Sequence, residues 1–348
     1  MSVLSQNGLV EVFLTPPARG ATDDLRQQLE AILSRQAHYD IASQQMADRG
    51  IVMALADLRA VRERRARVFV ESRYLTEADP LSPDQIWDPG GDRESNRQCF
   101  AALSRAGIEV RADVVGGALQ HVNLILAHGE TDRVLFLTSA NLAPGSIDKH
   151  LNWAVKISSP NVVDAVATLF DAIWDGDFRD ATVRFAFQGS AGRFGSLAAG
   201  AGGEAIDEAI VAITGARERI RFAYFTMTAD TRIVNALVAA ANRGVDVAGI
   251  VDADQGAQFW NAVPQLRDGG VDARYYPGAL TGASGRMHHK TIVIDHSLTY
   301  LATANASKAA EDSFEISVTF SDTQIARFVD AEILRLGANA STQPIGLL

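Results

Sequence analysis

Residues 287–295 read MHHKTIVID. The apolar part of this stretch, TIVI, predicts a strand that is buried on both faces. Because residues i and i+2 of a strand point to the same side, His288 and Lys290 share one face while His289 points to the other. The stretch therefore predicts a cluster of polar side chains at one end of a buried strand, which Asp295 closes at the other end.

Two further segments place polar groups close behind this strand. The segment YLATAN at residues 300–305 supplies a hydroxyl from Thr303 and a carboxamide from Asn305, and Glu315 adds a carboxylate. Together with a histidine and a lysine, these groups form a set suited to phosphoryl transfer. The set contains a nucleophile, an acid or base, and hydrogen-bond donors for phosphoryl oxygens.

The second half of the chain repeats the first. The segment LSRAGIEVR at residues 103–111 is similar to LRDGGVDAR at residues 266–274, and IVMAL at residues 51–55 is similar to IVNAL at residues 233–237. In both halves, strand-like segments alternate with segments of helical period. We therefore predict an α/β protein with two similar halves, each a mainly parallel mixed sheet flanked by helices.

Glycine-rich residues separate the two copies, and such a composition is typical of a linker. We predict an N-terminal half at residues 1–177, a linker at residues 178–203 and a C-terminal half at residues 204–348. A segment at residues 73–97 has no counterpart in the second copy. Its length predicts that it borders the mouth of the functional site and selects the substrate.

The composition is that of a folded globular protein, with 348 residues, 47% hydrophobic and 21% charged. A formal net charge of −10 disfavours a surface coated with nonspecific phosphate contacts, but it allows a local basic cleft. No apolar run approaches the roughly 20 residues that cross a bilayer, and the first residues lack the features of a secretory signal. We therefore expect a cytoplasmic location. Cys99 is the single cysteine, which excludes an intramolecular disulfide and a multi-cysteine zinc site.

The second copy resembles the signature of the phospholipase D superfamily, which is His-x-Lys-x4-Asp followed by Gly-Ser-x-Asn and a downstream glutamate. Here it reads His288, Lys290 and Asp295, then ATAN at residues 302–305, and then Glu315. Alanine and threonine replace the glycine and the serine, so this second motif keeps its polar groups. The resemblance covers nearly the whole chain and is to the nuclease-like branch of the superfamily.

The first copy of the motif is degenerate. His121 holds the histidine position, but Asn123 and His128 stand where the lysine and the aspartate belong. The segment TSAN at residues 138–141 matches the Gly-Ser-x-Asn element, and Asn152 falls at the glutamate position. This half therefore keeps the histidine, the hydroxyl and the asparagine, and it lacks the lysine and both carboxylates.

The resemblance implies that the two halves pack about a pseudo-twofold axis and contribute to one composite active site. One histidine attacks phosphorus to form a phosphohistidine, and the other protonates the leaving oxygen and then activates water or an alcohol. We assign the nucleophile to His288, oriented by Glu315 or Asp295. His121 is then the general acid, with Asn152 as its candidate orienter. The reverse assignment of the two histidines stays open.

The other polar residues of the two motifs are expected to hold the nonbridging phosphate oxygens, and Lys290 and Asn305 are counted as catalytic. The remaining phosphate-binding candidates are Thr303, Asn141, Ser139 and Asn123. The resemblance implies no metal or other cofactor, and the sequence shows no spacing of metal ligands that demands one. His289 and His296 are interpreted as neighbours of the motifs that pack or face solvent, and His150 as a surface residue near Asn152.

The function implied is a metal-independent phosphodiesterase that acts on nucleic acid in preference to phospholipid. A phospholipid hydrolase or transphosphatidylase is the second interpretation, with Leu75, Leu81, Ile86 and Trp87 as an apolar contact at a lipid interface. A noncatalytic phosphate-binding protein is the third, because the first motif is degenerate. A monomer is sufficient to form one composite site, and a homodimer is compatible with it.

Overall fold

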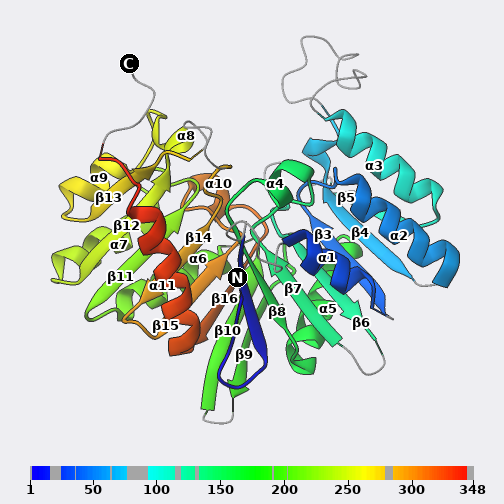
Figure 1. Ribbon diagram of the computed structural model, residues 1–348, viewed down its shortest axis with the longest axis horizontal. Coiled ribbons are helices and arrows are strands. Elements are labelled where there is room, and N and C mark those ends of the chain that lie inside the picture. Colours follow the sequence, from blue (N-terminus) through cyan, green and yellow to red (C-terminus); the bar gives the residue numbers. More distant parts are fainter. Residues whose placement is uncertain are drawn as a thin grey trace.

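The computed structural model describes residues 2–15, 25–35, 37–62, 65–76, 93–113, 119–129, 133–189, 192–201, 203–278 and 285–342. Within these residues, the chain forms two eight-stranded sheets, one in each half, with helices around them (Figure 1). The α/β architecture with two similar halves is therefore confirmed. No helix in this part of the chain has both the length and the apolar character needed to cross a membrane.

The two sheets have the same strand order. The first contains, from edge to edge, β1 (Ser2–Leu4), β2 (Val10–Thr15), β8 (Asn152–Ile157), β7 (Arg133–Thr138), β6 (Leu124–His128), β3 (His38–Ser43), β4 (Ala66–Glu71) and β5 (Glu109–Asp113). The second contains β9 (Val183–Gly189), β10 (Gly192–Gly200), β16 (Glu315–Ser321), β15 (Leu298–Ala302), β14 (Lys290–Ile294), β11 (Arg219–Tyr224), β12 (Asp246–Asp252) and β13 (Asp272–Tyr276). Each strand of one half thus has an equivalent in the other.

Antiparallel pairings predominate in both sheets, so the expected mainly parallel character is wrong. The parallel pairs are β3–β4 and β4–β5 in the first sheet and β11–β12 and β12–β13 in the second. Helices cross over between these strands, as parallel pairing requires. Strands β6 and β14 run antiparallel to β3 and β11. The residues just before β6 and β14, which include both motif histidines, therefore lie at the carboxyl ends of the parallel strands.

Helices in equivalent positions surround the two sheets. The first half contains α1 (Leu25–Leu33), α2 (Arg49–Arg62), the 3-10 helix η1 (Ser72–Tyr74), α3 (Glu94–Arg105), α4 (Pro144–Asp148) and α5 (Pro160–Trp174). The second contains α6 (Glu204–Gly215), α7 (Arg232–Asn242), α8 (Ala253–Gly256), α9 (Val263–Asp268), α10 (Lys308–Glu311) and α11 (Thr323–Gly337). Their apolar faces pack inward, as in α1, where leucine and isoleucine at helical spacing are buried.

Residues 178–203 are not a linker, although their glycine content predicts one. They contain the hairpin β9–β10, and β10 pairs with β16 as a strand of the second sheet. Glycine is needed here for space, because a Cβ on Gly195 would lie 2.3 Å from the carbonyl oxygen of Thr319 and 2.7 Å from the ring of Phe187. The hairpin is the equivalent of β1–β2, so the second copy of the repeat begins at β9 rather than at residue 204.

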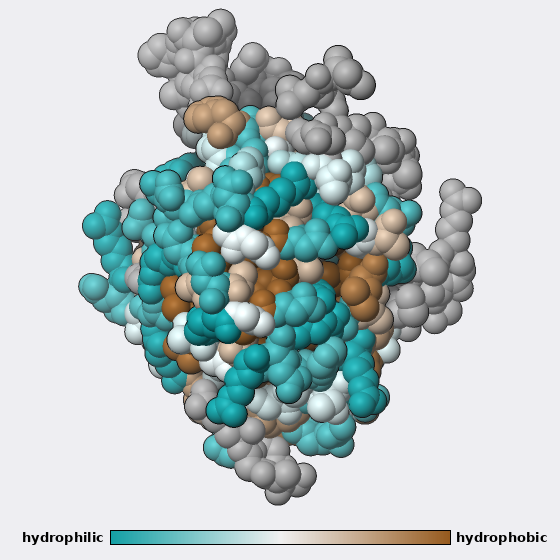
Figure 2. Space-filling model, turned by 90° about the vertical axis from the view of Figure 1, so that its left-hand side faces the viewer, coloured by the Kyte–Doolittle hydropathy of each residue, from teal (hydrophilic) through white to brown (hydrophobic). Residues whose placement is uncertain are grey.

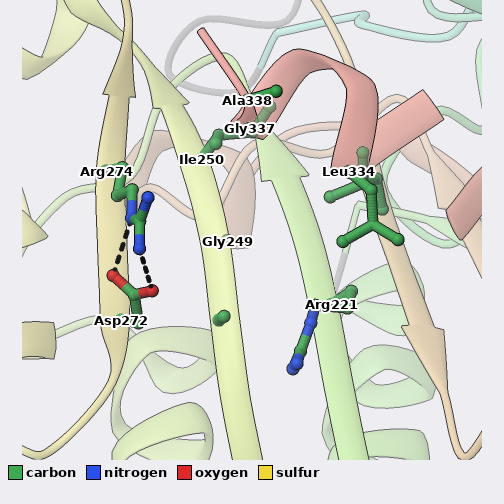
Figure 3. Close-up of a pocket in the computed structure, with 10 residues that line it drawn as sticks. Arg221, Gly249, Ile250, Asp272, Arg274, Leu334, Gly337 and Ala338 are labelled. Atoms are coloured by element: carbon green, nitrogen blue, oxygen red, sulfur yellow. Dashed lines mark hydrogen bonds and ion pairs between the residues drawn. The ribbon is translucent and has the colours of Figure 1, made fainter. Parts of the chain in front are cut away.

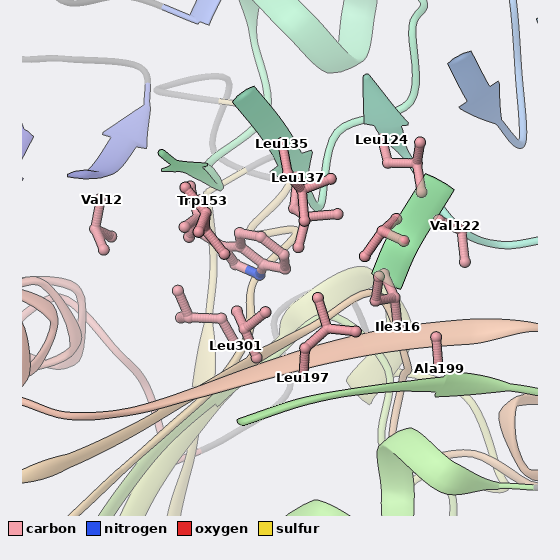
Figure 4. Packing of buried hydrophobic residues seen from close by; sticks show 14 of the residues in the cluster. Val12, Val122, Leu124, Leu135, Leu137, Trp153, Leu197, Ala199, Leu301 and Ile316 are labelled. Carbon is pink, nitrogen blue, oxygen red and sulfur yellow. The ribbon is translucent and has the colours of Figure 1, made fainter. Parts of the chain in front are cut away.

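One apolar core joins the two sheets. Figure 4 shows Leu137 and the fully buried Trp153 of the first sheet next to Leu197, Leu301 and Ile316 of the second. Helix α5 contacts β9, and α11 contacts β1, so each of these helices also reaches the other half. The halves are therefore packed as one body, and the strand ends that carry the motifs are held in fixed relative positions.

Candidate active site

Both motif histidines line one pocket between the two halves. The pocket has a volume of about 510 Å³, and His121 and His288 reach it from opposite halves. Asn141, Asn305 and Glu315 also lie on its wall. The structure therefore brings five of the residues singled out in the sequence together, at the carboxyl ends of β3 and β11.

A buried carboxylate fixes the main chain just before each histidine. The N–H of Gln120 donates to Glu71 at the end of β4 over 2.5 Å, and the N–H of Met287 donates to Asp252 at the end of β12 over 2.7 Å. Strands β4 and β12 occupy the same position in the two sheets, so these bonds are equivalent. Each histidine loop is thereby anchored to its own half.

The main chain of each histidine also bonds to the opposite half. The N–H of His121 donates to the carbonyl of Phe314 over 3.0 Å, and the N–H of His288 donates to the carbonyl of Leu151 over 2.8 Å. Phe314 and Leu151 are the residues that directly precede the glutamate positions of the second and first motifs. Each histidine is therefore held beside the glutamate position of the other half.

Glu315 orients His121 rather than His288. Its Oε1 lies 2.7 Å from Nδ1 of His121, and its Oε2 accepts a hydrogen bond from Oγ1 of Thr303 over 2.5 Å. A carboxylate at Nδ1 fixes the orientation of the ring and leaves Nε2 of His121 free for proton transfer. The hydroxyl of Thr303, which the sequence assigns to phosphate binding, is engaged with Glu315 instead.

Asn152 orients His288 in the equivalent arrangement. Its Oδ1 lies 3.1 Å from Nδ1 of His288 and accepts a hydrogen bond from Oγ of Ser139 over 3.0 Å. Its Nδ2 donates to the main-chain carbonyls of Ser146 and His150, over 2.8 and 3.2 Å. These bonds fix which end of the amide faces the ring, so Nδ1 of His288 carries the proton and Nε2 keeps its lone pair. Ser139 is thus engaged with Asn152 rather than free to bind phosphate.

The orienting residues are therefore exchanged relative to the sequence-based assignment. That assignment gives Glu315 to His288 and Asn152 to His121, and the structure reverses both pairings. The cause is the main-chain pairing between the halves, which the spacing within one motif does not encode. A carboxylate serves His121, and a neutral amide serves His288.

Asp295 does not join the site, because it lies at the opposite end of β14. Its carboxylate accepts hydrogen bonds from the N–H groups of Arg217, Glu218 and Arg219, each over 2.9 Å, and so ties β14 to the start of β11. Burial alone would raise the pKa of this carboxyl, but the three N–H donors outweigh burial and hold the pKa below its usual range. Asp295 is therefore a structural residue of the sheet rather than an orienter of His288.

The aspartate position of the first motif is remote from the pocket as well. His128 lies at the end of β6, where its Nε2 is 2.9 Å from Oδ2 of Asp40. Asp40 also forms an ion pair with Arg67, over 2.6 Å. The positions that end β6 and β14 thus both brace their own half.

Lys290 is fully buried next to His288. Its Nζ lies 3.0 Å from Nε2 of His288 and 5.5 Å from the centre of the Phe225 ring. Burial lowers the pKa of Lys290 to about 7. Burial and then the charge of Lys290 lower the pKa of His288 well below its usual value, so the imidazole of His288 is neutral near pH 7.

Asn123, at the second lysine position, belongs to a network of amides. Its Oδ1 accepts hydrogen bonds from Oγ of Ser43 over 2.8 Å and from the main-chain N–H of Gln44 over 3.2 Å. Its Nδ2 donates to Oδ1 of Asn141 over 3.2 Å, and Nδ2 of Asn141 donates to Oε1 of Gln44 over 3.1 Å. Asn141 and Gln44 line the pocket, whereas Asn123 is buried behind them.

Among the lining residues that the sequence does not assign to the pocket are a histidine and an arginine. His150 lines the pocket, and its ring centre lies 5.9 Å from that of His288. The pKa of His150 is lowered to about 4, mainly by burial and to a smaller extent by the charge of Arg286. Arg286 also lies on the wall. The only signal for His150 in the sequence is its position two residues before Asn152, because alternate residues of an extended chain share a side.

The segment at residues 73–97 meets the pocket at one end. Tyr74 lines the pocket, and the guanidinium carbon of Arg93 lies 4.1 Å from the centre of its ring. Leu75 packs against the core of the first half, so it is not an exposed lipid contact. Residues 77–92 lie outside the described residues, and their role in substrate selection stays a prediction.

A second cavity, of about 310 Å³, lies on the outer side of the second half and lacks this chemistry. Figure 2 shows that side, where apolar residues are exposed among hydrophilic ones. In Figure 3, Ile250 and Leu334 flank the cavity, and Arg274 forms an ion pair with Asp272, over 2.8 Å. No motif residue is among the described residues that line it, so the pocket between the halves is the candidate active site.

The solved structures of two enzymes have the same fold as this chain. Phosphatidylserine synthase from Haemophilus influenzae Rd KW20 is similar with a TM-score of 0.66 and 12% identity, over 98% of this chain and 88% of that one. Polyphosphate kinase from Porphyromonas gingivalis is similar with a TM-score of 0.61 and 14% identity over 94% of this chain, which spans 50% of the kinase. The phospholipase D family member Nuc from Salmonella typhimurium is 24% identical over 42% of this chain and 96% of its own, with a TM-score of 0.38. The likeness to the synthase and the kinase, at identities this low, shows the fold alone.

The family is shown by the sequence itself. No curated protein sequence matches the chain. The family described as "Cardiolipin synthase, PLD-like domain" matches residues 29–174 and 209–336, one segment in each half. Because these two segments cover most of both halves, the chain belongs to the "Cardiolipin synthase, PLD-like domain" family of the phospholipase D superfamily.

Proposed function

We propose that this protein cleaves phosphodiester bonds through a phosphohistidine intermediate on His288. The observation that carries the proposal is the pair of histidines from opposite halves, which line one pocket and have different partners at Nδ1. A neutral imidazole with a free Nε2 lone pair is a nucleophile. An imidazole held by a carboxylate is suited to donating and accepting a proton.

In the first step, the lone pair on Nε2 of His288 attacks phosphorus, and the bond from phosphorus to the leaving oxygen breaks. His121, protonated and held by Glu315, gives its Nε2 proton to that oxygen, so that an alcohol departs. In the second step, water loses a proton to His121 and attacks phosphorus, and the phosphorus–nitrogen bond breaks. An alcohol in place of water gives a transfer product instead of hydrolysis.

Three donors are proposed to hold the nonbridging oxygens during both steps. In its protonated form, Lys290 donates to Nε2 of His288 in the empty site, and it is positioned to turn to a phosphoryl oxygen once that nitrogen is bonded to phosphorus. Asn141 and Asn305 line the pocket from opposite halves. A preorganised donor of this kind stabilises a transition state by about 3 kcal/mol. The two imidazoles supply nucleophile, acid and base, so the proposal includes no metal.

Nucleic acid is the substrate class that we favour. Most side chains on the described wall of the pocket are polar, and they include Gln44, Arg286 and Tyr74. A polar wall favours a hydrophilic diester over acyl chains. The large apolar side chains that are exposed in the described part of the chain all lie elsewhere: Leu4, Met53, Val211, Phe259 and Leu334.

A phospholipid is the second candidate. The family description names cardiolipin synthase, and one structure with the same fold is a phosphatidylserine synthase. Under this alternative, water in the second step gives hydrolysis of the phospholipid, and an alcohol acceptor in its place gives transphosphatidylation. A noncatalytic phosphate-binding protein, the third alternative, would bind phosphate without turnover.

Turnover assays separate these candidates. The protein is incubated with bis(p-nitrophenyl) phosphate, with single-stranded DNA or RNA, and with phospholipid vesicles, each with and without EDTA. The proposal predicts turnover of the generic diester and of single-stranded nucleic acid, unchanged by EDTA. Turnover of the vesicles alone would favour the second candidate, and loss of activity in EDTA would contradict the metal-free mechanism. Binding of inorganic phosphate without any turnover would support the third.

A further inference from the structure

Gln44 in the first half and Phe225 in the second occupy equivalent positions with different chemistry. Gln44 follows Ala42 by two residues, and Phe225 follows Ala223 by two residues. Each of these alanines pairs across its sheet with the residue three positions after the motif histidine. The pairs are Ala42 with Leu124 in the first sheet and Ala223 with Thr291 in the second. An amide in one half therefore stands where an aromatic ring stands in the other.

In the second half, the ring of Phe225 packs against the motif. Its centre lies 4.7 Å from that of the His288 ring and 5.5 Å from Nζ of Lys290. A phenyl ring has no N–H or O–H to donate to a substrate. Lys290 is therefore the donor to phosphate at this end of the site.

In the first half, both residues are exchanged together, the lysine for Asn123 and the ring for Gln44. The main-chain N–H of Gln44 donates to Oδ1 of Asn123, which leaves Nδ2 of Asn123 to donate to Oδ1 of Asn141. Both ends of the Asn123 side chain thus bond to protein neighbours, and the side chain does not line the pocket. Asn123 positions its neighbours and does not itself reach the substrate.

The same chain of bonds sets the direction of the Gln44 amide. Because Oδ1 of Asn141 is an acceptor, Nδ2 of Asn141 donates to Oε1 of Gln44, over 3.1 Å. Nε2 of Gln44 then has no acceptor among the residues that the structure describes. Gln44 is only 6% exposed and lines the pocket. A donor on the pocket wall that has no acceptor in the protein is available to an acceptor from a ligand.

We propose that Nε2 of Gln44 binds a nonbridging oxygen of the phosphodiester and takes the place of the lysine that the first motif lacks. This inference rests on the proposed phosphodiesterase function, and it adds a source of specificity. A phosphate-binding site with one lysine and one amide has one positive charge less than a site with two lysines. It therefore matches the single charge of a diester better than the double charge of a monoester or of inorganic phosphate.

Three substitutions at one position test the inference. Gln44→Leu removes the donor, Gln44→Glu keeps the shape and Oε1 but replaces the donor with a negative oxygen, and Gln44→Lys adds a positive charge. Turnover of bis(p-nitrophenyl) phosphate is measured together with competitive inhibition by inorganic phosphate. Q44L should lower kcat/KM by about 10-fold to 100-fold, and Q44E should lower it further. Q44K should retain more activity than Q44L and should bind inorganic phosphate about tenfold more tightly than wild type.

The control is Gln98→Leu, the same chemical change on α3, where Nε2 of the glutamine bonds to Glu94 on the exposed side. It should leave kcat/KM and phosphate inhibition unchanged, and thermal melting confirms that every variant is folded. Unchanged activity in Q44L and Q44E, or unchanged phosphate affinity in Q44K, would overturn the role of Gln44 while the function stands. Failure of wild type to turn over any diester would overturn the proposed function and this inference with it.

Discussion

Asn152 makes the two histidines of the site different from each other. Its Oδ1 faces His288 and Ser139, and its Nδ2 donates to the carbonyls of Ser146 and His150. A carboxylate in the same place would direct one oxygen at two carbonyl oxygens, which repel it. The surroundings are therefore built for an amide. The first motif is an altered arrangement rather than a damaged copy of the second.

Replacing Asn152 with aspartate should therefore reduce activity, although it adds a carboxylate at the glutamate position. We expect the two carbonyls left without a donor to cost about 1–3 kcal/mol of stability. We also expect a lower kcat/KM, because repulsion from the two carbonyl oxygens displaces the side chain that holds Nδ1 of His288. Urea unfolding and steady-state kinetics with a phosphodiester measure the two effects. A variant more active than wild type would mean that the first motif has simply lost a carboxylate.

Motif spacing predicts which residues meet, but it does not predict which residue serves which histidine. The five motif residues on the pocket wall precede, begin or follow strands that meet at one edge of each sheet, and the strand pattern of the sequence predicts these positions. The pairing of Glu315 with His121 depends on main-chain contacts across the halves, between residues far apart in the sequence. Likewise, local spacing does not show that the side chains of three predicted phosphate binders are engaged with protein neighbours: Asn123, Ser139 and Thr303.

At the level of the elements, the two ends of β14 have different roles, one in the site and one in holding the sheet together. Lys290 is its first residue, beside His288, and Asp295 directly follows its last residue. Five steps of about 3.3 Å place these two residues roughly 16 Å apart. Asp295 is therefore too far along the strand to orient His288, and it fastens β14 to the start of β11 instead.

Asp295→Ala should accordingly lower stability by about 1–3 kcal/mol and leave kcat/KM nearly unchanged. The lowered pKa of Asp295 means that the carboxylate stabilises the fold fully above its unfolded pKa, and that this contribution is lost as the pH falls through the folded pKa. The difference in free energy of unfolding between wild type and variant should thus be larger at about pH 7 than at about pH 3. Urea titrations at both pH values measure it. Lost activity at unchanged stability would instead return Asp295 to the catalytic residues.

At the level of the elements, glycine content leads to a wrong prediction for residues 178–203. Alternating strands and helices, together with the repeat, correctly predict the elements of both halves, but residues 178–203 are a hairpin and not a linker. Glycine makes an exposed chain flexible, yet in a sheet it allows close packing, as at Gly195 against Thr319. The composition of the segment is the same in both cases, so only the packing distinguishes them.

At the scale of the whole molecule, the halves share one core, and the site exists only where they meet. Trp153 is fully buried between the sheets, in one cluster with apolar residues of the second half. The same packing holds the backbone segments that carry His121 and His288 against the opposite half. Stability and the geometry of the site therefore have a common origin.

Trp153→Ala should therefore destabilise both halves together. We expect a loss of about 3–5 kcal/mol, typical of removing a buried aromatic side chain. Unfolding should remain one transition at a lower temperature, because neither half keeps an intact core without the other. Scanning calorimetry of wild type and variant measures this. Two separate transitions, of which only one moves, would show that the halves are independent domains.

The central claim is that His288 is the nucleophile and His121 is the general acid and base. Rapid-quench trapping with a radiolabelled diester that has a p-nitrophenolate leaving group tests it directly, since that group departs without a proton. Wild type and His121→Ala should both acquire label, and His121→Ala should accumulate it, because it lacks the base that activates water. His288→Ala should stay unlabelled. Label on His288→Ala, with none on His121→Ala, would contradict the account and exchange the two roles.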